Sequence, residues 1–345
     1  MNTVRNILIK SGPACKVCEK ILTRPIHLSS VTSSKLLEVG KLEPVKTQEK
    51  YEVGQFFLHR VLKYRGVTLF PWTARVYDRD VANNSSNSSN SPSFDDEMPY
   101  DMMKSGRFET QTYYQVLIDQ RDLPTIKMQP EGFCYLPDRK LHHLYSVEGL
   151  DYTSHDDILP YTSTEEEPFH HQLFSQFFSP VLKDDVVSEF VARELLAAWR
   201  DKNQWLEMTE VRRETTYGIR VTVIPFYVGR QVEDQQVKYW WRYTIRLENL
   251  QQQRVQLAER HMRIFSSTGM FESTKGKGVF GKMALVLSPR QPAFQYNSYA
   301  CLSSPSGHMW GTFRMERQDG SLFDIRIPPF FLHSKEDENE KTKPV

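Results

Sequence analysis

The residues with the most recognisable spacing for chemistry are three glycines in the last third of the chain. Gly276, Gly278 and Gly281 fit the pattern G-x-G-x-x-G, whose backbone amides can cradle a phosphate, and Lys275 and Lys277 lie beside them. The pattern has that meaning when it follows a buried strand and opens a helix. Here strand-like sequence lies on both sides, and no helical pattern follows. We favour a tight connection between strands and keep the phosphate loop as the alternative.

A second candidate for binding chemistry is a run in which aromatic and basic residues are interleaved, Lys238-Tyr239-Trp240-Trp241-Arg242-Tyr243. Aromatic rings with basic neighbours can stack on single-stranded bases. In a strand, Trp240, Arg242 and Arg246 would point to the face opposite Tyr239 and Trp241. We interpret the inward aromatic residues as core, and we keep Trp240, Arg242 and Arg246 on the outer face as the candidates for binding a partner.

Histidine, cysteine and carboxylate residues do not occur at the spacing of a metal site or a catalytic centre. Cys15 and Cys18 form a lone C-x-x-C without a second pair of ligands. The adjacent histidines at 142–143 and 170–171 would point to opposite sides of a strand. Residues 154–157, Ser-His-Asp-Asp, predict a turn with a capping Ser or Asp rather than a triad. From these residues we assign no catalytic site, no metal and no cofactor.

The elements that position these residues in the second half are strands. Residues 239–247 alternate between apolar and polar side chains, and residues 306–316 do the same. Gln318-Asp319-Gly320 is a hairpin signal, and residues 322–327 form the return strand. Six or seven such strands within about 115 residues predict a two-sheet sandwich.

The first half has a different pattern. Short apolar runs broken by Gly and Pro predict a small barrel-like sheet, and they lie at residues 56–60, 67–71, 114–118 and 133–136. Asn and Ser crowd residues 83–93, so a disordered loop is expected there. Between the two β regions, apolar residues from Val187 to Trp199 fall at helical spacing. This spacing predicts a packed helix over residues 185–202.

Charge is unevenly distributed along the 345 residues. Residues 1–50 contain nine Lys/Arg and four Asp/Glu, which leaves 35 basic and 39 acidic residues in the rest. A body with a net charge of −4 lacks the basic footprint of a general nucleic-acid binder. The leader is basic, rich in hydroxyl groups and poor in acids, which is typical of a mitochondrial transit peptide. No run reaches the roughly 18 apolar residues of a membrane span, so no membrane partner is expected.

Two parts of the chain resemble known domain families. Residues 54–161 are similar to the YccV-like, or hemimethylated-DNA-binding, domain, on the pieces Gly54-Gln55, His59, Tyr64-Arg65-Gly66-Val67, Tyr113-Tyr114-Gln115-Val116-Leu117 and Tyr135-Leu136. Residues 219–332 resemble an ApaG domain, on the pieces Tyr243-Thr244-Ile245-Arg246-Leu247-Glu248-Asn249, Glu259-Arg260-His261, Gly307-His308-Met309-Trp310-Gly311 and Ile327-Pro328-Pro329-Phe330. A transit-like leader, a YccV-like domain and an ApaG domain in that order resemble a family of polymerase-interacting adaptor proteins.

The resemblance implies a non-catalytic adaptor or scaffold in replication and DNA damage tolerance, including translesion synthesis. The partners it implies are DNA polymerase subunits, a primase-polymerase, the sliding clamp and the mitochondrial unfoldase-protease. It also implies a location in the mitochondrial matrix, with a second pool in the nucleus. Two alternatives stay open: a regulator of the unfoldase-protease system, and a nucleotide- or DNA-binding module whose direct contact with nucleic acid is weak.

These observations predict a mainly β protein, in which a helical connector joins a small YccV-like β-barrel to an ApaG immunoglobulin/fibronectin-III-like β-sandwich. The predicted ranges are 1–50 for the transit peptide and disordered leader, 51–180 for the YccV-like domain with a disordered loop at 82–107, 181–210 for the connector, 211–333 for the ApaG domain and 334–345 for a disordered tail.

Overall fold

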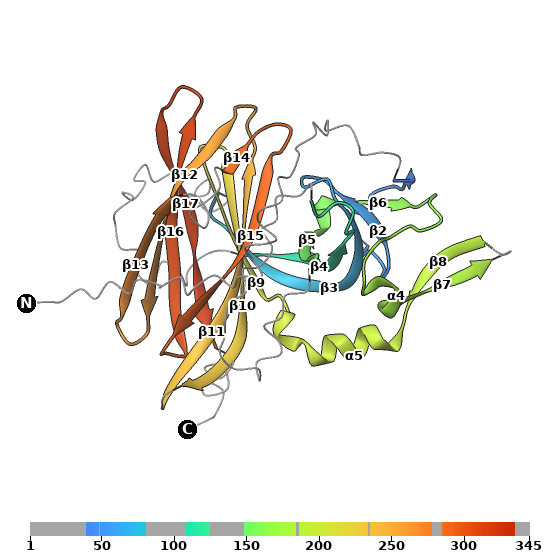
Figure 1. Ribbon diagram of the computed structural model, residues 1–345, viewed down its shortest axis with the longest axis horizontal. Helices are drawn as coiled ribbons and strands as arrows, with labels where there is room; N and C mark the ends of the chain where they lie inside the picture. Colours follow the sequence, from blue (N-terminus) through green and yellow to red (C-terminus); the bar gives the residue numbers. More distant parts are fainter. Residues whose placement is uncertain are drawn as a thin grey trace, which may run out of the picture. The chain divides into compact units, whose positions relative to one another are not determined.

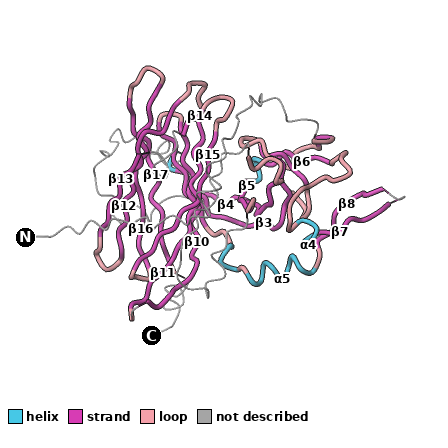
Figure 2. Tube along the Cα trace, in the orientation of Figure 1, coloured by secondary structure: helices cyan, strands magenta, loops and turns pink. Residues whose placement is uncertain are grey.

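Strands dominate the computed structural model of the chain (Figure 2). The structure describes residues 39–47, 49–80, 108–124, 148–183, 186–233, 235–277 and 285–334, without the side chains of residues 182–189 and 233. Residues 1–38 of the predicted leader, the predicted loop at 82–107 and the tail beyond Ser334 lie outside these residues. Among the described residues, no helix is both long and apolar enough to cross a membrane.

The first module is an antiparallel sheet that continues from strand to strand in the order β1-β6-β2-β3-β4-β5 (Figure 1). Its strands are β1 (Lys41–Leu42), β2 (Phe56–His59), β3 (Arg65–Asp78), β4 (Glu109–Ile118), β5 (Leu150–Ser154) and β6 (Ile158–Thr162). A short 3-10 turn, η2 (His155–Asp157), connects the last two. Large apolar side chains form its core, among them Phe57, Leu69, Tyr114 and Leu117 from these strands and Tyr64 just before β3.

The second module is a sandwich of two antiparallel sheets with a dense apolar core between them. One layer contains β9 (Glu210–Thr216), β10 (Ile219–Glu233), β11 (Gln236–Asn249) and β15 (Ala293–Leu302). The other layer is five-stranded and contains β12 (Val255–Ser266), β13 (Phe271–Lys277), β14 (Leu285–Leu287), β16 (Ser306–Arg317) and β17 (Leu322–His333). Trp241, Ile245, Phe313 and Phe330 are almost fully buried in this core. The predicted two-sheet sandwich is confirmed.

The predicted hairpin at residues 306–327 is also confirmed, as β16 and β17. Met309, Phe313 and Met315 are buried, whereas Trp310 between them is only half-buried, so the side chains alternate as expected. The turn has Gly320 at φ +80°, a conformation that a glycine adopts at little cost. The backbone N–H of Gly320 donates to the carbonyl of Arg317 at 3.0 Å.

The prediction of a helix over residues 185–202 is wrong for its first half. Backbone pairing joins β7 (Phe178–Lys183) to β8 (Val186–Ala192) as a separate hairpin, and only α5 (Glu194–Lys202) is helical (Figure 1). Two short elements complete this region, α4 (Phe174–Phe177) and the 3-10 turn η3 (Gln204–Leu206). The sequence of β8 is rich in valine, which favours strands, and the pairing with β7 outweighs an apolar spacing that also fits a helix.

The fold also includes residues before the predicted start of the first folded unit near Tyr51. Lys41 and Leu42 pair with Thr162 and Tyr161, and the N–H of Glu43 donates to the carbonyl of Pro160 at 2.8 Å. The residues that follow are held too, since the N–H of Lys46 donates to the hydroxyl of Tyr51 at 3.1 Å.

Removing residues 1–50 should therefore destabilise the protein more than removing residues 1–38. The longer deletion loses the pairing of β1 with β6 and the hydrogen bonds of the Glu43 and Lys46 N–H groups, so we expect a loss of about 2 kcal/mol in the free energy of unfolding. Urea denaturation of the two deletion variants measures the difference. Equal unfolding midpoints would show that β1 does not contribute to the stability of the first module.

Candidate functional site: a buried polar junction between two β modules

The outer face of β11 carries the side chains that the sequence marked for partner binding, and the first module covers most of that face. Arg242 is 5% exposed and Arg246 is 7% exposed, while Trp240 is half-buried. The two arginines are therefore buried and do not lie on an open face, and the binding of a partner by these side chains stays a prediction. The covering surface includes Tyr152, whose ring lies 4.9 Å from that of Phe226 on the neighbouring strand β10.

The two modules are joined by backbone as well as by side chains. Strand β3 of the first module runs parallel to β9 of the second, with Arg75 opposite Glu210 and Asp78 opposite Arg213. One sheet therefore continues from the first module into the sandwich. Apolar side chains from both modules pack over this seam, and they include Ala74, Val76, Tyr113, Met208, Val211 and Ile224.

An ion pair lies at the centre of the junction. The guanidinium of Arg246 on β11 donates from Nη2 to Oδ2 of Asp151 on β5 at 3.1 Å, and to the carbonyl of Tyr152 at 3.1 Å. The side chain of Arg246 is 8% exposed and that of Asp151 is 2% exposed. Water is therefore almost excluded from the pair, and each charge depends on the other for compensation.

Neutral polar groups complete the hydrogen bonding of this pair. Gln295 on β15 accepts from Nε of Arg246 at 2.7 Å and donates to Oδ1 of Asp151 at 2.6 Å. The hydroxyl of Tyr64 donates to Oδ2 of Asp151 at 2.7 Å. We call Tyr64, Asp151, Arg246 and Gln295 the junction cluster. Its members come from both modules, so the cluster fixes one register between them.

Burial and charge shift the titration of the groups around the junction cluster. Burial lowers the pKa of His59, and the charge of Arg246 lowers it further, so His59 is neutral at pH 7. Its Nδ1 accepts from the N–H groups of Val61 and Leu62. Burial raises the pKa of Tyr64, and the charge of Asp151 raises it further. Burial alone would lower the pKa of Arg246, but the opposite charge of Asp151 raises it, which keeps the guanidinium charged.

A small cavity of about 30 Å³ lies beside the cluster, and residues of both modules line it. Arg213 and Arg220 face it together with the acids Asp157 and Glu248. Burial raises the pKa of Glu248, and the positive charge of Arg246 partly offsets this increase. A volume of this size has room for a few water molecules and none for a substrate. We therefore interpret the junction as an element that couples the modules rather than as a reaction centre.

Only the first residue of the glycine pattern is described. Gly276 belongs to β13 and pairs with Arg260 of β12. A Cβ atom added to Gly276 would meet no atom within 4 Å, and its φ is not in the left-handed region. Gly278 and Gly281 lie outside the described residues, so the phosphate loop stays a hypothesis.

The polar residues that the sequence analysis weighed for metals and catalysis have structural partners where they are described. His170 pairs with Glu167 at 3.1 Å, and Nε2 of His171 lies 2.8 Å from the carbonyl of Glu148. The hydroxyl of Ser154, the last residue of β5, donates to Asp157 at 2.7 Å, so the predicted turn is present, but no side-chain hydrogen bond caps it. Within the described part of the chain, no group of three His, Cys, Asp or Glu residues could hold a metal ion. Cys15, Cys18, Cys134 and the histidines at 142–143 lie outside it.

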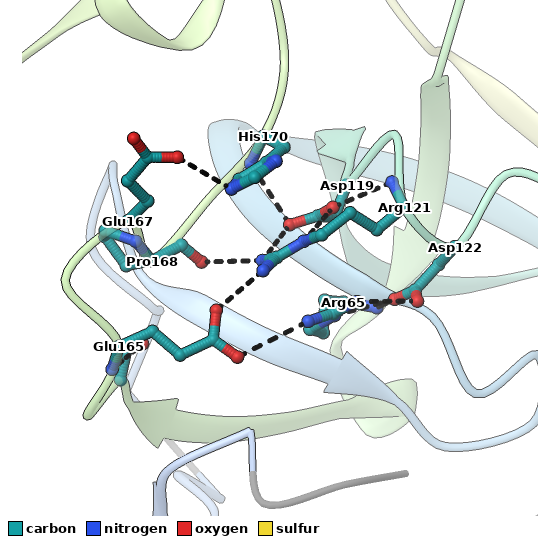
Figure 3. A network of polar contacts seen from close by, with 9 residues as sticks. Arg65, Asp119, Arg121, Asp122, Glu165, Glu167, Pro168 and His170 are labelled. Carbon is teal, nitrogen blue, oxygen red and sulfur yellow. Dashed lines mark hydrogen bonds and ion pairs between the residues drawn. The ribbon is translucent and has the colours of Figure 1, made fainter. Parts of the chain in front are cut away.

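A second polar network belongs entirely to the first module, and the sequence analysis did not anticipate it (Figure 3). Glu165 lies between two arginines, with carboxylate oxygens 3.6 Å from Arg65 and 2.7 Å from Arg121. Arg65 also pairs with Asp122 at 2.9 Å, and Arg121 pairs with Asp119 at 2.7 Å. The network holds the segment after β6 against the turn after β4. No local spacing signals it, because its members are up to a hundred residues apart.

Family models match both modules in the predicted order. Residues 49–185 match the model described as "Hemimethylated DNA-binding protein YccV like", and residues 229–317 match the ApaG domain. Protein ApaG of Paramagnetospirillum magneticum is 43% identical over 121 residues, which cover 35% of this chain and 92% of that protein. The fold and the junction thus define a two-module β protein in which a YccV-like domain precedes an ApaG domain.

Two relatives share both modules. "Polymerase delta-interacting protein 2" of Mus musculus and of Homo sapiens are each 52% identical to this chain over 326 residues, covering 92% of this chain and 85% of each relative. At this identity and coverage, the chain belongs to the polymerase delta-interacting protein 2 family. The resemblance inferred from the sequence motifs is confirmed.

Proposed function

We propose that this protein is a non-catalytic adaptor that binds DNA polymerases or a primase-polymerase and regulates them during replication and DNA damage tolerance. The observation that carries the proposal is the 52% identity over 92% of the chain to proteins whose name states an interaction with polymerase delta. The junction supports it, because a buried cluster that fixes two modules in one register suits a protein that presents both to a partner. We extend the proposal to the sliding clamp as a further partner and to the mitochondrial matrix and the nucleus as locations.

A direct binding experiment tests the proposal. The full chain is immobilised, and purified polymerase delta, a primase-polymerase, the sliding clamp and the mitochondrial unfoldase are passed over it in turn. We expect saturable binding of a polymerase, and a change in its primer extension when the chain is added in solution. Binding of the unfoldase alone would move the function to the protease system, and retention of none of the four would refute the adaptor role.

The description of the first module's family favours one second candidate, a DNA-binding role for residues 49–185. Duplex DNA with one methylated strand is the probe that this description suggests. Retention of the full chain at low salt that falls steeply as salt is raised would support phosphate contacts. Equal, negligible retention of methylated, hemimethylated and unmethylated duplexes would end this alternative.

A further inference from the structure

Four aromatic side chains gather on the solvent-facing side of the five-stranded sheet, where polar residues are the norm. Phe265 on β12 lies opposite Phe271 on β13 and opposite His308 on β16, which places all three on one face. Trp310 follows His308 by two residues and shares that face. We call Phe265, Phe271, His308 and Trp310 the aromatic platform.

The rings of the platform contact one another across three strands. His308 stacks on Trp310 with ring centroids 5.0 Å apart, Phe265 lies 5.3 Å from His308, and Phe271 lies 6.1 Å from Trp310. Phe265 is 36% exposed and Phe271 is 51% exposed. Burial lowers the pKa of His308, so its ring is neutral at pH 7 and adds aromatic surface.

The platform is not part of the core of the sandwich. The core is formed by the opposite face of the same strands. Met309, Phe313 and Met315 lie on that face, and each is at most 6% exposed. Exposed aromatic clusters of this kind on folded proteins mark interaction sites, because a bound partner removes their apolar area from water.

The charges beside the platform are positive. Arg263 lies opposite Trp310, in the row of the sheet next to the two phenylalanines. Lys275 lies opposite His261, in the row after that. None of the described residues that pair across the sheet in the rows of Phe265, Arg263 and His261 is an acid. The first acids on this face, Glu259 and Asp324, come in the following row, where Arg314 pairs with them.

We propose that the aromatic platform binds an acidic peptide segment of a partner protein, whose aromatic or aliphatic side chains pack on the rings. Charge complementarity with Arg263 and Lys275 selects the acidic segment. Single-stranded nucleic acid is the other anionic ligand that stacks on aromatic rings. Arg326, in the row of His261, already pairs with Glu214 at 3.5 Å, so Arg263 and Lys275 would neutralise about two phosphates, too few to retain nucleic acid on a body of net negative charge.

A peptide selection identifies what the platform binds. A phage-displayed library of random peptides is selected on the full chain after depletion on a variant that carries both Trp310→Ala and Phe271→Ser. We expect the surviving peptides to be rich in Asp and Glu and to contain aromatic residues. The strongest is synthesised with a fluorescent label, and its Kd is measured by anisotropy.

Single variants then locate the contact. Trp310→Ala and Phe271→Ser should each raise the Kd by about tenfold or more, as expected for residues at the centre of an interface. Lys275→Glu should also weaken binding, and added salt should reduce the wild-type affinity. Phe108→Ala is the matched control, because Phe108 is 49% exposed and belongs to the first module. It should leave the Kd unchanged. Thermal unfolding of each variant confirms that it is folded.

Three results would overturn the proposal. One is the failure of any acidic consensus to emerge, another is a consensus rich in Lys and Arg, and the third is a peptide that binds the Trp310→Ala variant as tightly as the wild type. Labelled oligothymidylate is measured in parallel. If it binds the wild type and is lost in Trp310→Ala, the face binds nucleic acid and the peptide proposal fails. None of these results depends on whether a polymerase is the partner.

Discussion

Replacing Arg246 with methionine should lower the free energy of unfolding by about 3–5 kcal/mol, the cost of leaving a buried charge without its partner. Methionine keeps much of the length of the side chain, so the loss reflects charge rather than a large cavity. Asp151, with a side chain 2% exposed, would retain only hydrogen bonds from Tyr64 and Gln295. Urea denaturation at pH 7 measures the loss, because the linear extrapolation reports the free energy of unfolding in water.

The matched control for this prediction is Arg314→Met in the same module. Arg314 pairs with Asp324 at 2.9 Å, but its side chain is 47% exposed, so water replaces the lost partner and stability should hardly change. A second test combines Arg246→Met with Asp151→Asn, which removes both charges. This double variant should be more stable than Arg246→Met alone, because no buried charge is left unpaired. If Arg246→Met behaves like Arg314→Met, water reaches Asp151 in solution and the modules are not held by this cluster.

Replacing Gly311 with alanine should destabilise the sandwich by about 3 kcal/mol or more, at the upper end of what overpacking costs. A Cβ atom on Gly311 would lie 2.1 Å from the carbonyl oxygen of His261 and 3.2 Å from the Cα of Met262. Both atoms are backbone of β12, so no side-chain rotation relieves the contact and the two strands must separate. The free energy of unfolding from urea denaturation measures the effect.

Gly276→Ala is the internal control for Gly311→Ala, since both glycines lie on strands that pair with β12. No atom lies within 4 Å of a Cβ at Gly276, and its φ is compatible with alanine. The change should leave stability unchanged or raise it by about 0.4–1 kcal/mol, because alanine restricts the unfolded chain. Equal losses in both variants would show that the close approach at Gly311 is relieved without cost.

The sandwich strands were predictable because their signal is local. Alternation over residues 239–247 and 306–316 depends only on which neighbours along the chain are apolar, and it placed Trp241 in the core correctly. The segment at 185–202 failed for the complementary reason. Its apolar spacing fits a helix, but β7 supplies a pairing partner that a local pattern cannot reveal.

The candidate site was predictable only in part. Alternation correctly put Arg242 and Arg246 on the face of β11 away from the sandwich core, but it could not show that another module covers that face. The partner of Arg246 is Asp151, which lies 95 positions earlier in the chain. The aromatic platform could not be predicted from the sequence for the same reason, since Phe271 and Trp310 meet only because β13 and β16 both pair with β12.

The sequence by itself determined that the chain is mainly β, that two modules follow one another, and to which domain families they are similar, because alternation and motifs are written in neighbouring residues. The tertiary structure alone decided which polar side chains are buried and which aromatic rings stay in water. Burial depends on what packs over a residue from elsewhere in the chain. Arg246 is buried because the first module packs over its face of the sandwich, whereas Trp310, on the outer face of the other layer, is only half-buried.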